Sequence, residues 1–150
     1  MFVGGAVSDR RGFTLIELIV VLLLVAILFS IAVARYVDLM EESKISSLKA
    51  SLDAVREGLR VFYVEQMVAG AGRYPTIVEL GDGSGGSQVV ATGLIPDNAF
   101  DADGTPANVV DASGQSRGTV IGAAGGWAYR PDTGEVWANT DTNDVHENTF

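Results

Sequence analysis

The groups that could do chemistry in this chain of 150 residues are few, and the densest set is an acidic segment past its middle. Asp97, Asp101 and Asp103 place three carboxylates within seven residues, and Gly104 follows them. Calcium takes about six to eight oxygen ligands, and a glycine permits the tight turn that such a loop needs. The segment lacks the other ligands of an EF-hand loop, and aspartates are also common in solvated turns. A calcium site and a solvated turn both remain open.

No other cluster predicts catalysis. Cysteine is absent and His146 is the single histidine, which excludes a thiol nucleophile, a disulfide and a cysteine-based metal site. Asp141, Asp144 and Glu147 lie close to His146, but in a terminal tail we expect them to be solvated. The glycine-rich segments lack the strand, helix and lysine of a phosphate-binding loop. We therefore predict a protein that is not an enzyme and needs no cofactor, apart from the possible calcium.

The charge distribution argues against nucleic acid as a partner. The chain has a formal net charge of -9, and past Gly70 it contains eleven acidic and three basic residues. A surface of this sign repels phosphate backbones.

One carboxylate, Glu17, stands at the head of an apolar run. Leu18 to Ala34 is a stretch of 17 residues with no charge, glycine or proline. Such a helix is apolar on every side, as a helix in a membrane or in a buried core must be. A charged carboxylate costs about 2–3 kcal/mol near the centre of a membrane and less near its surface. Glu17 therefore calls for a functional explanation.

An ordinary signal peptide is one interpretation of this N-terminus. Arg10 and Arg11 would form its basic part, Leu18 to Ile31 its apolar part, and Ala32-Val33-Ala34 its cleavage site. A soluble secreted binding module or enzyme would then begin at Arg35. A signal peptide gains nothing from an acidic residue, however, and an amphipathic pattern continues directly out of the apolar run.

That continuation predicts one long helix over residues 13 to about 68, because the segment contains no proline and only Gly58 as a glycine. Its second half has an apolar stripe with spacings of three and four residues, made of Ile45, Leu48, Leu52, Val55, Leu59 and Phe62. We expect this stripe to pack against the protein's own domain rather than to form a coiled coil. The helix should end near Gly70-Ala71-Gly72.

Residues 73 to 150 are predicted to form loops and short strands. Candidate strands are Gln88–Thr92 and Thr119–Ile121, and the clearest signal is a hairpin. In it, Trp127 to Arg130 and Glu135 to Ala138 flank the turn Pro131-Asp-Thr-Gly134. We expect Trp127 to be buried against the helix stripe.

The segment Gly12-Phe13-Thr14-Leu15-Ile16-Glu17, with Arg10-Arg11 before it and the apolar run after it, resembles the prepilin signature of type IV pilins and type II secretion pseudopilins. Pro96 to Phe100, Gly125 to Tyr129 and Thr133 to Asn139 are similar to the C-terminal sheet of many pilin-like proteins. The resemblance implies an α+β, pilin-like fold, in which one long N-terminal helix packs on a small antiparallel sheet.

The resemblance also implies four parts of the chain. Residues 1–12 would be a leader peptide, 13–35 the transmembrane and filament-core half of the helix, 36–70 its amphipathic half, and 71–150 the loops and sheet of the head.

Processing and assembly are implied as well. A prepilin peptidase would cut between Gly12 and Phe13 and methylate the new amino group of Phe13. The product would span the bacterial inner membrane once, with a periplasmic head. An assembly platform in that membrane would then join copies of this chain, together with related pilins or pseudopilins, into a filament. The filament would be a periplasmic pseudopilus or a cell-surface pilus.

Within the family the carboxylate at the position of Glu17 pairs with the amino terminus of a neighbouring subunit, here Phe13. The alternative is that Glu17 has no partner in assembly and only extends to the lipid headgroups.

Two further features bear on the type of subunit. Pilins of adhesive or retractile filaments commonly carry proline where this chain has Ala34, and its absence favours a pseudopilin or minor pilin without deciding between them. Major pseudopilins bind calcium in acidic loops beside the C-terminal sheet, which by resemblance assigns Asp97, Asp101 and Asp103 to such a site.

Overall fold

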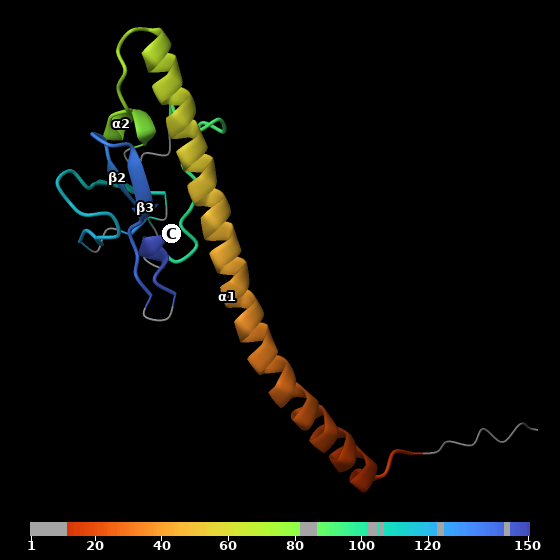
Figure 1. Cartoon of the computed structure of the whole chain (residues 1–150). Coiled ribbons are helices and arrows are strands. Elements are labelled where there is room, and N and C mark those ends of the chain that lie inside the picture. Colours follow the sequence, from red (N-terminus) through yellow and green to blue (C-terminus); the bar gives the residue numbers. More distant parts are fainter. Residues whose placement is uncertain (1–11, 82–86, 102–104, 106, 123–124, 143–144) are drawn as a thin grey trace, which may run out of the picture. The chain divides into compact units, whose positions relative to one another are not determined.

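The computed structural model describes residues 12–81, 87–101, 105, 107–122, 125–142 and 145–150. Its elements in chain order are α1 (Leu15–Val68), α2 (Ile77–Leu80), β1 (Val109–Asp111), β2 (Trp127–Arg130), β3 (Glu135–Ala138) and the short 3-10 helix η1 (Glu147–Thr149), as Figure 1 shows. The α+β, pilin-like class predicted from the sequence is confirmed. The chain divides into two compact units, Met1–Met40 and Glu41–Phe150, and the second is called the head below.

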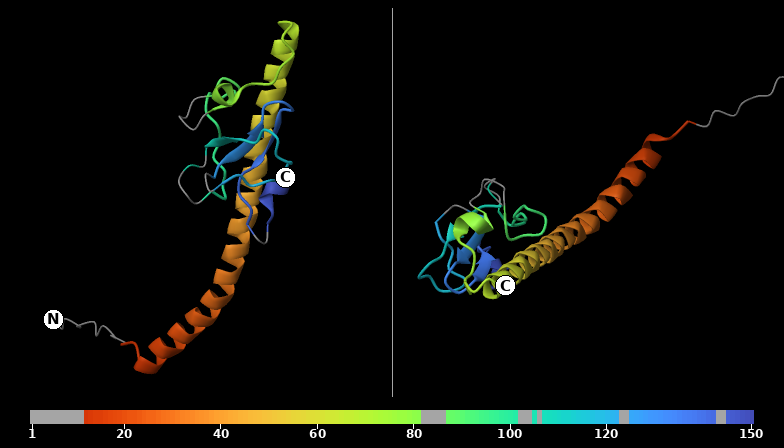
Figure 2. Two further views of the ribbon diagram at one scale, coloured as in Figure 1. Left: turned by 90° about the vertical axis from the view of Figure 1, so that its left-hand side faces the viewer. Right: turned by 90° about the horizontal axis from the view of Figure 1, so that it is seen from above.

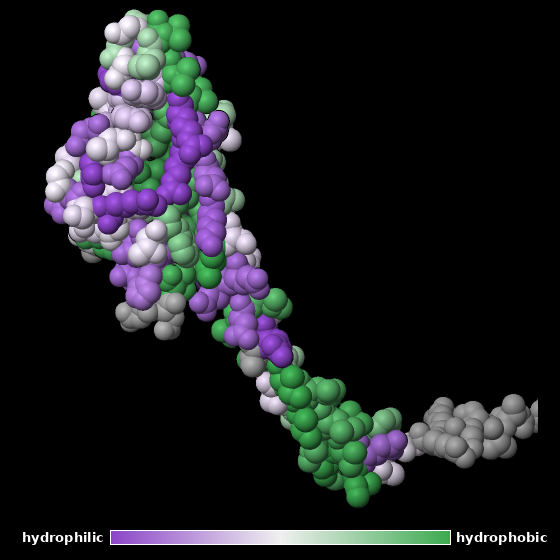
Figure 3. Space-filling model, viewed as in Figure 1, coloured by the Kyte–Doolittle hydropathy of each residue, from purple (hydrophilic) through white to green (hydrophobic). Residues whose placement is uncertain are grey.

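The first unit consists of the N-terminal part of α1 and the residues before it. Its apolar side chains are exposed on every side of the helix, for example Leu22, Leu28 and Ile31. Figure 3 shows hydrophobic residues gathered over this part of α1. The hydroxyl of Ser30 donates a hydrogen bond of 2.8 Å to the carbonyl of Ile27. The polar side chain is thereby satisfied within its own helix, as an apolar environment requires.

The part of α1 that belongs to the head buries the predicted stripe. Five of its six members are buried and Ile45 is half-buried; the buried ones are Leu48, Leu52, Val55, Leu59 and Phe62. They pack against the head's own sheet and loops, as predicted. The helix also ends where predicted: Gly70 has a positive φ of 82°, and the amide of Ala71 donates to the carbonyl of Gln66 at 2.8 Å.

The predicted hairpin is confirmed. β2 and β3 are antiparallel, with Trp127 opposite Ala138 and Arg130 opposite Glu135. Gly134 has a φ of 72°, and its amide donates to the carbonyl of Arg130 at 2.9 Å, which closes the turn. The sheet as a whole is mixed rather than antiparallel, because β1 pairs with β2 in parallel.

Side chains alternate between the two faces of this sheet. Trp127 and Tyr129 join the cluster that contains the helix stripe, so the predicted burial of Trp127 is confirmed. Trp137 lies on the opposite face with Ala128, Ala112 and Ile121. One face therefore packs on α1 and the other is covered by the connection from β1 to β2; Figure 2 shows the sheet beside the second half of α1.

The predicted strand at Gln88–Thr92 is wrong. The segment turns sharply, and the amide of Gly93 donates to the carbonyl of Val90 at 2.8 Å. Val89 and Val90 are nevertheless buried in the core. The apolar residues that suggested a strand are buried as part of a loop. Residue type alone does not distinguish a buried loop from a buried strand.

The predicted strand at Thr119–Ile121 is also wrong, for a different reason. The side chain of Asn139 bonds this segment in place of a neighbouring strand: its Oδ1 accepts from the amide of Ile121 at 2.7 Å, and its Nδ2 donates to the carbonyl of Ile121 at 3.1 Å. The indole of Trp137 donates to the carbonyl of Thr119 at 3.0 Å. Side chains therefore satisfy backbone groups that a sheet would otherwise pair.

Close packing explains why residue 58, in the middle of the long helix, is a glycine. A Cβ atom at this position would lie 2.6 Å from the carbonyl oxygen of Val89. The loop after α2 can therefore approach the helix only where the side chain is absent.

The C-terminal segment is not a solvated tail. Glu147 is fully buried, and its carboxylate accepts from the amide of Thr142 at 2.9 Å and from the Thr142 hydroxyl at 2.8 Å. Burial alone would raise the pKa of Glu147, but these hydrogen bonds outweigh it and lower the pKa. His146 and Asp141 are exposed and lie 3.0 Å apart, as expected from the sequence, and Asp144 is outside the described residues.

Candidate processing and assembly site

The predicted processing site lies just before the first residue of α1. Gly12 and Phe13 precede the helix, and the side chain of Phe13 is 74% exposed. A Cβ atom on Gly12 would meet nothing within 4 Å. The peptide bond between Gly12 and Phe13 therefore lies before the helical hydrogen-bond ladder, and the residues on both sides of it are exposed.

Thr14 and Glu17 cap the start of the helix reciprocally. The Thr14 hydroxyl accepts a hydrogen bond of 3.3 Å from the amide of Glu17, and the Glu17 carboxylate accepts one of 3.5 Å from the amide of Thr14. The amide of Leu18 donates to the carbonyl of Thr14 at 3.2 Å, which is the first bond of the ladder. This arrangement is a capping box, and it also places a negative charge at the positive end of the helix dipole.

The surroundings make Glu17 unusual. It is the one charged residue between Phe13 and Ala34, and the described side chains around it are exposed and apolar. Its hydrogen bond to Thr14 is long, at 3.5 Å, and so holds the carboxylate only weakly. The site combines an accessible bond, a capped helix start and one loosely held carboxylate.

The structure leaves the calcium prediction untested. Asp97 is exposed, Asp101 accepts a hydrogen bond of 3.0 Å from the amide of Gly126, and Asp103 lies outside the described residues. Within the described part of the chain, no three histidine, aspartate or glutamate side chains are placed to hold a metal ion.

Two features of the structure were not predicted from the sequence. The role of Thr14 could have been found, because threonine followed three residues later by glutamate is a capping-box signal. The second feature is a pocket in the head with three arginines in its lining, Arg56, Arg60 and Arg117. No sequence pattern predicts it, since Arg117 is supplied by the distant connection between β1 and β2.

Comparison with known proteins decides the family. The sequence profile described as the prokaryotic N-terminal methylation motif matches residues 7–33, which include the predicted processing site. A fimbrial protein of Pseudomonas aeruginosa is 31% identical over 137 residues, covering 85% of this chain and 83% of the relative. The chain belongs to the type IV pilin family.

A second relative of this pilin is the type IV narrow pilus major component PilA5 of Thermus thermophilus. It is 40% identical over 55 residues, which cover 37% of this chain and 47% of the relative. No solved structure is significantly similar to the pilin. The relatives are structural proteins, in agreement with the prediction that the chain is not an enzyme.

Proposed function

We propose that this pilin is cut by a prepilin peptidase between Gly12 and Phe13, methylated on the amino group of Phe13, and assembled into a type IV pilus or a type II secretion pseudopilus. The observation that carries the proposal is an exposed Gly12–Phe13 segment before a capped helix, α1, whose apolar side chains from Leu15 to Val33 are exposed in the isolated chain. An apolar surface of this kind needs either lipid or other subunits to cover it.

Before assembly, the apolar segment is proposed to span the bacterial inner membrane. α1 has the length and composition of a membrane-spanning helix. The 17 residues from Leu18 to Ala34 rise about 25 Å, close to the roughly 30 Å of a hydrocarbon core. Arg10 and Arg11 would keep the N-terminal end in the cytoplasm by the positive-inside bias, and the head would be periplasmic.

During assembly, Glu17 is proposed to pair with the amino group of Phe13 in a neighbouring subunit. Moving the apolar segment from lipid to a filament core changes little hydrophobic free energy, because both surroundings are apolar. Polar pairing can then select the register, since a misplaced subunit leaves a buried charge unpaired. The weak bond from Thr14 leaves the carboxylate available for this stronger partner.

The ordinary signal peptide is disfavoured by the same structure. α1 continues from Leu15 to Val68 without a break at Ala34 and Arg35, where that cleavage would occur. The relatives' names support the pilus over the pseudopilus. Alanine at position 34, in place of the family's common proline, favours a pseudopilin or a minor pilin without deciding between them.

The test is mass spectrometry of the mature chain, combined with fractionation of the cells. A first residue of N-methylated Phe13 is expected, in filaments sheared from the surface for a pilus or in the periplasm for a pseudopilus. A mature chain that begins at Arg35, or an uncut precursor, would contradict the proposal.

A further inference from the structure

A groove in the head lies between α1 and the loop that follows α2. It consists of two adjoining pockets of about 550 and 340 Å³, which share Ala54, Val90 and Thr92 in their linings. Most of the lining residues are apolar, and among them the side chain of Val61 is 48% exposed. An apolar surface of this kind on a head indicates a contact with another apolar surface.

The charged residues that line the groove are all acidic. Glu57 and Glu65 belong to α1, and Asp97 belongs to the loop; all three are exposed. Among the described side chains, Glu65 forms no ion pair, and Glu57 has only a long one of 3.6 Å with Arg60. The groove therefore suits an apolar partner that carries a positive charge.

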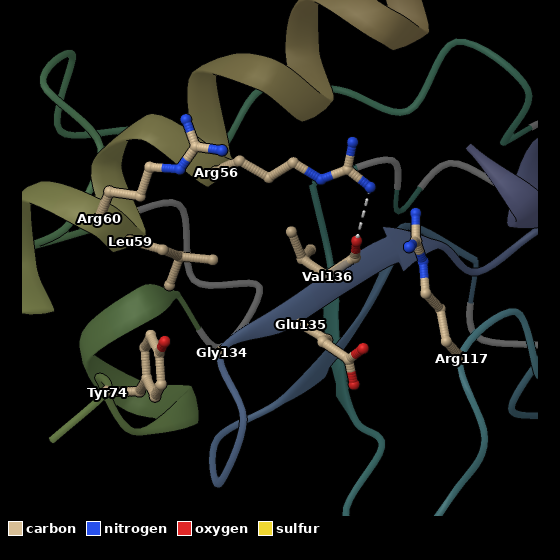
Figure 4. Close-up of a pocket in the computed structure, with 8 residues that line it drawn as sticks. All are labelled: Arg56, Leu59, Arg60, Tyr74, Arg117, Gly134, Glu135 and Val136. Atoms are coloured by element: carbon tan, nitrogen blue, oxygen red, sulfur yellow. Dashed lines mark hydrogen bonds between the residues drawn. The ribbon is translucent and has the colours of Figure 1, made fainter.

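The basic side chains of the head are engaged within the head. Arg56 and Arg117 both donate to one oxygen of Phe150, at 2.8 and 3.0 Å. Figure 4 shows that Arg56 is also directed to the carbonyl of Val136. The other basic side chains form ion pairs or lie over aromatic rings of the head: Lys44, Lys49, Arg60, Arg73 and Arg130. A positive charge for the groove is therefore best supplied from outside the head.

Residues 35–40 of α1 have the complementary composition. Arg35 is the single basic residue in the part of α1 that belongs to the first unit; it is exposed and forms no ion pair with any described side chain. Three exposed side chains, Tyr36, Leu39 and Met40, share its face of the helix within an arc of about 140°. This face combines one positive charge with an apolar surface. The carboxylates of the same stretch fall outside that arc: Asp38, Glu41 and Glu42.

Assembly changes the surroundings of Arg35. The residue directly follows the apolar run 18–34, so in the proposed membrane-bound state water and lipid headgroups hydrate its guanidinium. Packing of this helix face in a filament removes that hydration, and a desolvated guanidinium without a carboxylate is costly. Glu65 offers a carboxylate that has no ion pair in its own head.

We propose that the groove binds residues 35–40 of a second copy of this chain, with Arg35 paired to Glu65. The inference rests on the proposed function, since a filament supplies the second copy at high effective concentration. Tyr36, Leu39 and Met40 then cover the apolar lining of the groove, and the ion pair fixes the position of one subunit on the other.

Cysteine cross-linking of filaments tests the contact, because the chain has no cysteine of its own. Two versions of the full chain are co-expressed, each with one reporter. Ser43→Cys continues the helix face of Arg35, and Ala91→Cys lies in the lining of the groove. A short bis-maleimide joins the two thiols as thioethers, so a dimer that contains one copy of each version is a contact between subunits by construction. The matched control replaces Ala91→Cys by Ser116→Cys, which is exposed and does not line the groove.

We expect a dimer of the Ser43→Cys and Ala91→Cys copies, and none in the control. Filaments that give no such dimer, or give as much of it in the control, would overturn the docking proposal. Cross-linking of the Ala91→Cys copy to a different protein instead would assign the groove to another occupant and would also overturn it.

Exchange of the two charges tests the ion pair. Arg35→Glu and Glu65→Arg should each reduce filament yield by about two- to five-fold, the factor that one exposed ion pair contributes, and the double variant should restore it. N-methylated Phe13 should persist in all three, since neither residue lies at the predicted processing site. A double variant with the combined loss of both single variants would contradict the pairing.

The docking proposal and the proposed function fail in different ways. Wild-type filaments with N-methylated Phe13 but without the cross-link would leave the proposed function intact. Absence of filaments and of N-methylated Phe13 from the wild-type chain would overturn the proposed function, and the docking proposal with it.

Discussion

Trp127 should be one of the largest contributors to the stability of the head. It is fully buried between the helix stripe and the sheet, and its indole nitrogen donates a hydrogen bond of 2.8 Å to the carbonyl of Pro96. Trp127→Ala removes the ring and leaves a cavity. The surrounding residues can fill it only in part, because the pairing of β2 with β3 limits how far they can move.

The expected loss follows from these contacts. Burial of a large aromatic side chain is worth about 3–5 kcal/mol in such substitutions, and a carbonyl left without its donor adds about 1 kcal/mol or more. A head of this size has about 5–15 kcal/mol of total stability. The melting temperature should therefore fall by roughly 15 °C or more. Trp127→Phe keeps most of the ring but loses the donor, and should cost about 1–3 kcal/mol.

Thermal and urea denaturation of a soluble fragment, residues 36–150, measures both variants. The control is Leu94→Ala, because the side chain of Leu94 is 58% exposed and its loss should change stability by no more than about 0.5 kcal/mol. An unchanged melting temperature for Trp127→Ala would refute the assignment of this core.

Substitution of Gly12 by glutamate should leave the precursor uncut in the membrane, because a bulky side chain obstructs the peptidase; mature-length protein at normal yield on an immunoblot would contradict the proposed processing. Glu17→Val should permit membrane insertion and cleavage but give little or no filament in electron micrographs. Filaments should form only where wild-type subunits supply the carboxylate that pairs with Phe13. Normal filaments of the variant alone would show that the carboxylate is not needed for assembly. Because the pKa of Glu147 is lowered in the fold, the stability it contributes is complete above its ordinary value of 4.5 and is lost as the pH falls through the folded-state pKa. Glu147→Gln should therefore be less stable than the wild type in urea at about pH 7, and the gap should close at low pH; a gap independent of pH would contradict this linkage. Calcium should raise the melting temperature of the head, and Asp101→Ala with Asp103→Ala should abolish the rise; equal melting in calcium and in excess chelator would exclude the site.

The sequence by itself determined the features that depend on neighbouring residues. The absence of proline predicted a helix that the structure confirms from Leu15 to Val68, and spacings of three and four residues identified the buried stripe. Turn residues between two short aromatic segments were enough to predict the hairpin. The processing motif is likewise continuous in sequence, which is why the profile of the family finds it.

Contacts between distant segments were decided only by the tertiary structure. β1 has three residues and pairs in parallel with β2 across a long connection, so its own sequence carries little signal. Thr119–Ile121 is bonded by the side chain of Asn139 instead of a strand. The need for Gly58 depends on the loop at Val89, and the burial of Glu147 depends on hydrogen bonds from Thr142.

The arginine pocket shows the same limit most clearly. Arg56 and Arg60 belong to a helix face that the sequence could describe, but Arg117 joins them only because the sheet brings its connection beside α1. Periodicity and turn chemistry act over a few residues and can be read along the chain. Close approach of like charges and satisfaction of buried polar groups depend on the complete packing, because their free energy is set by partners that are far away in sequence.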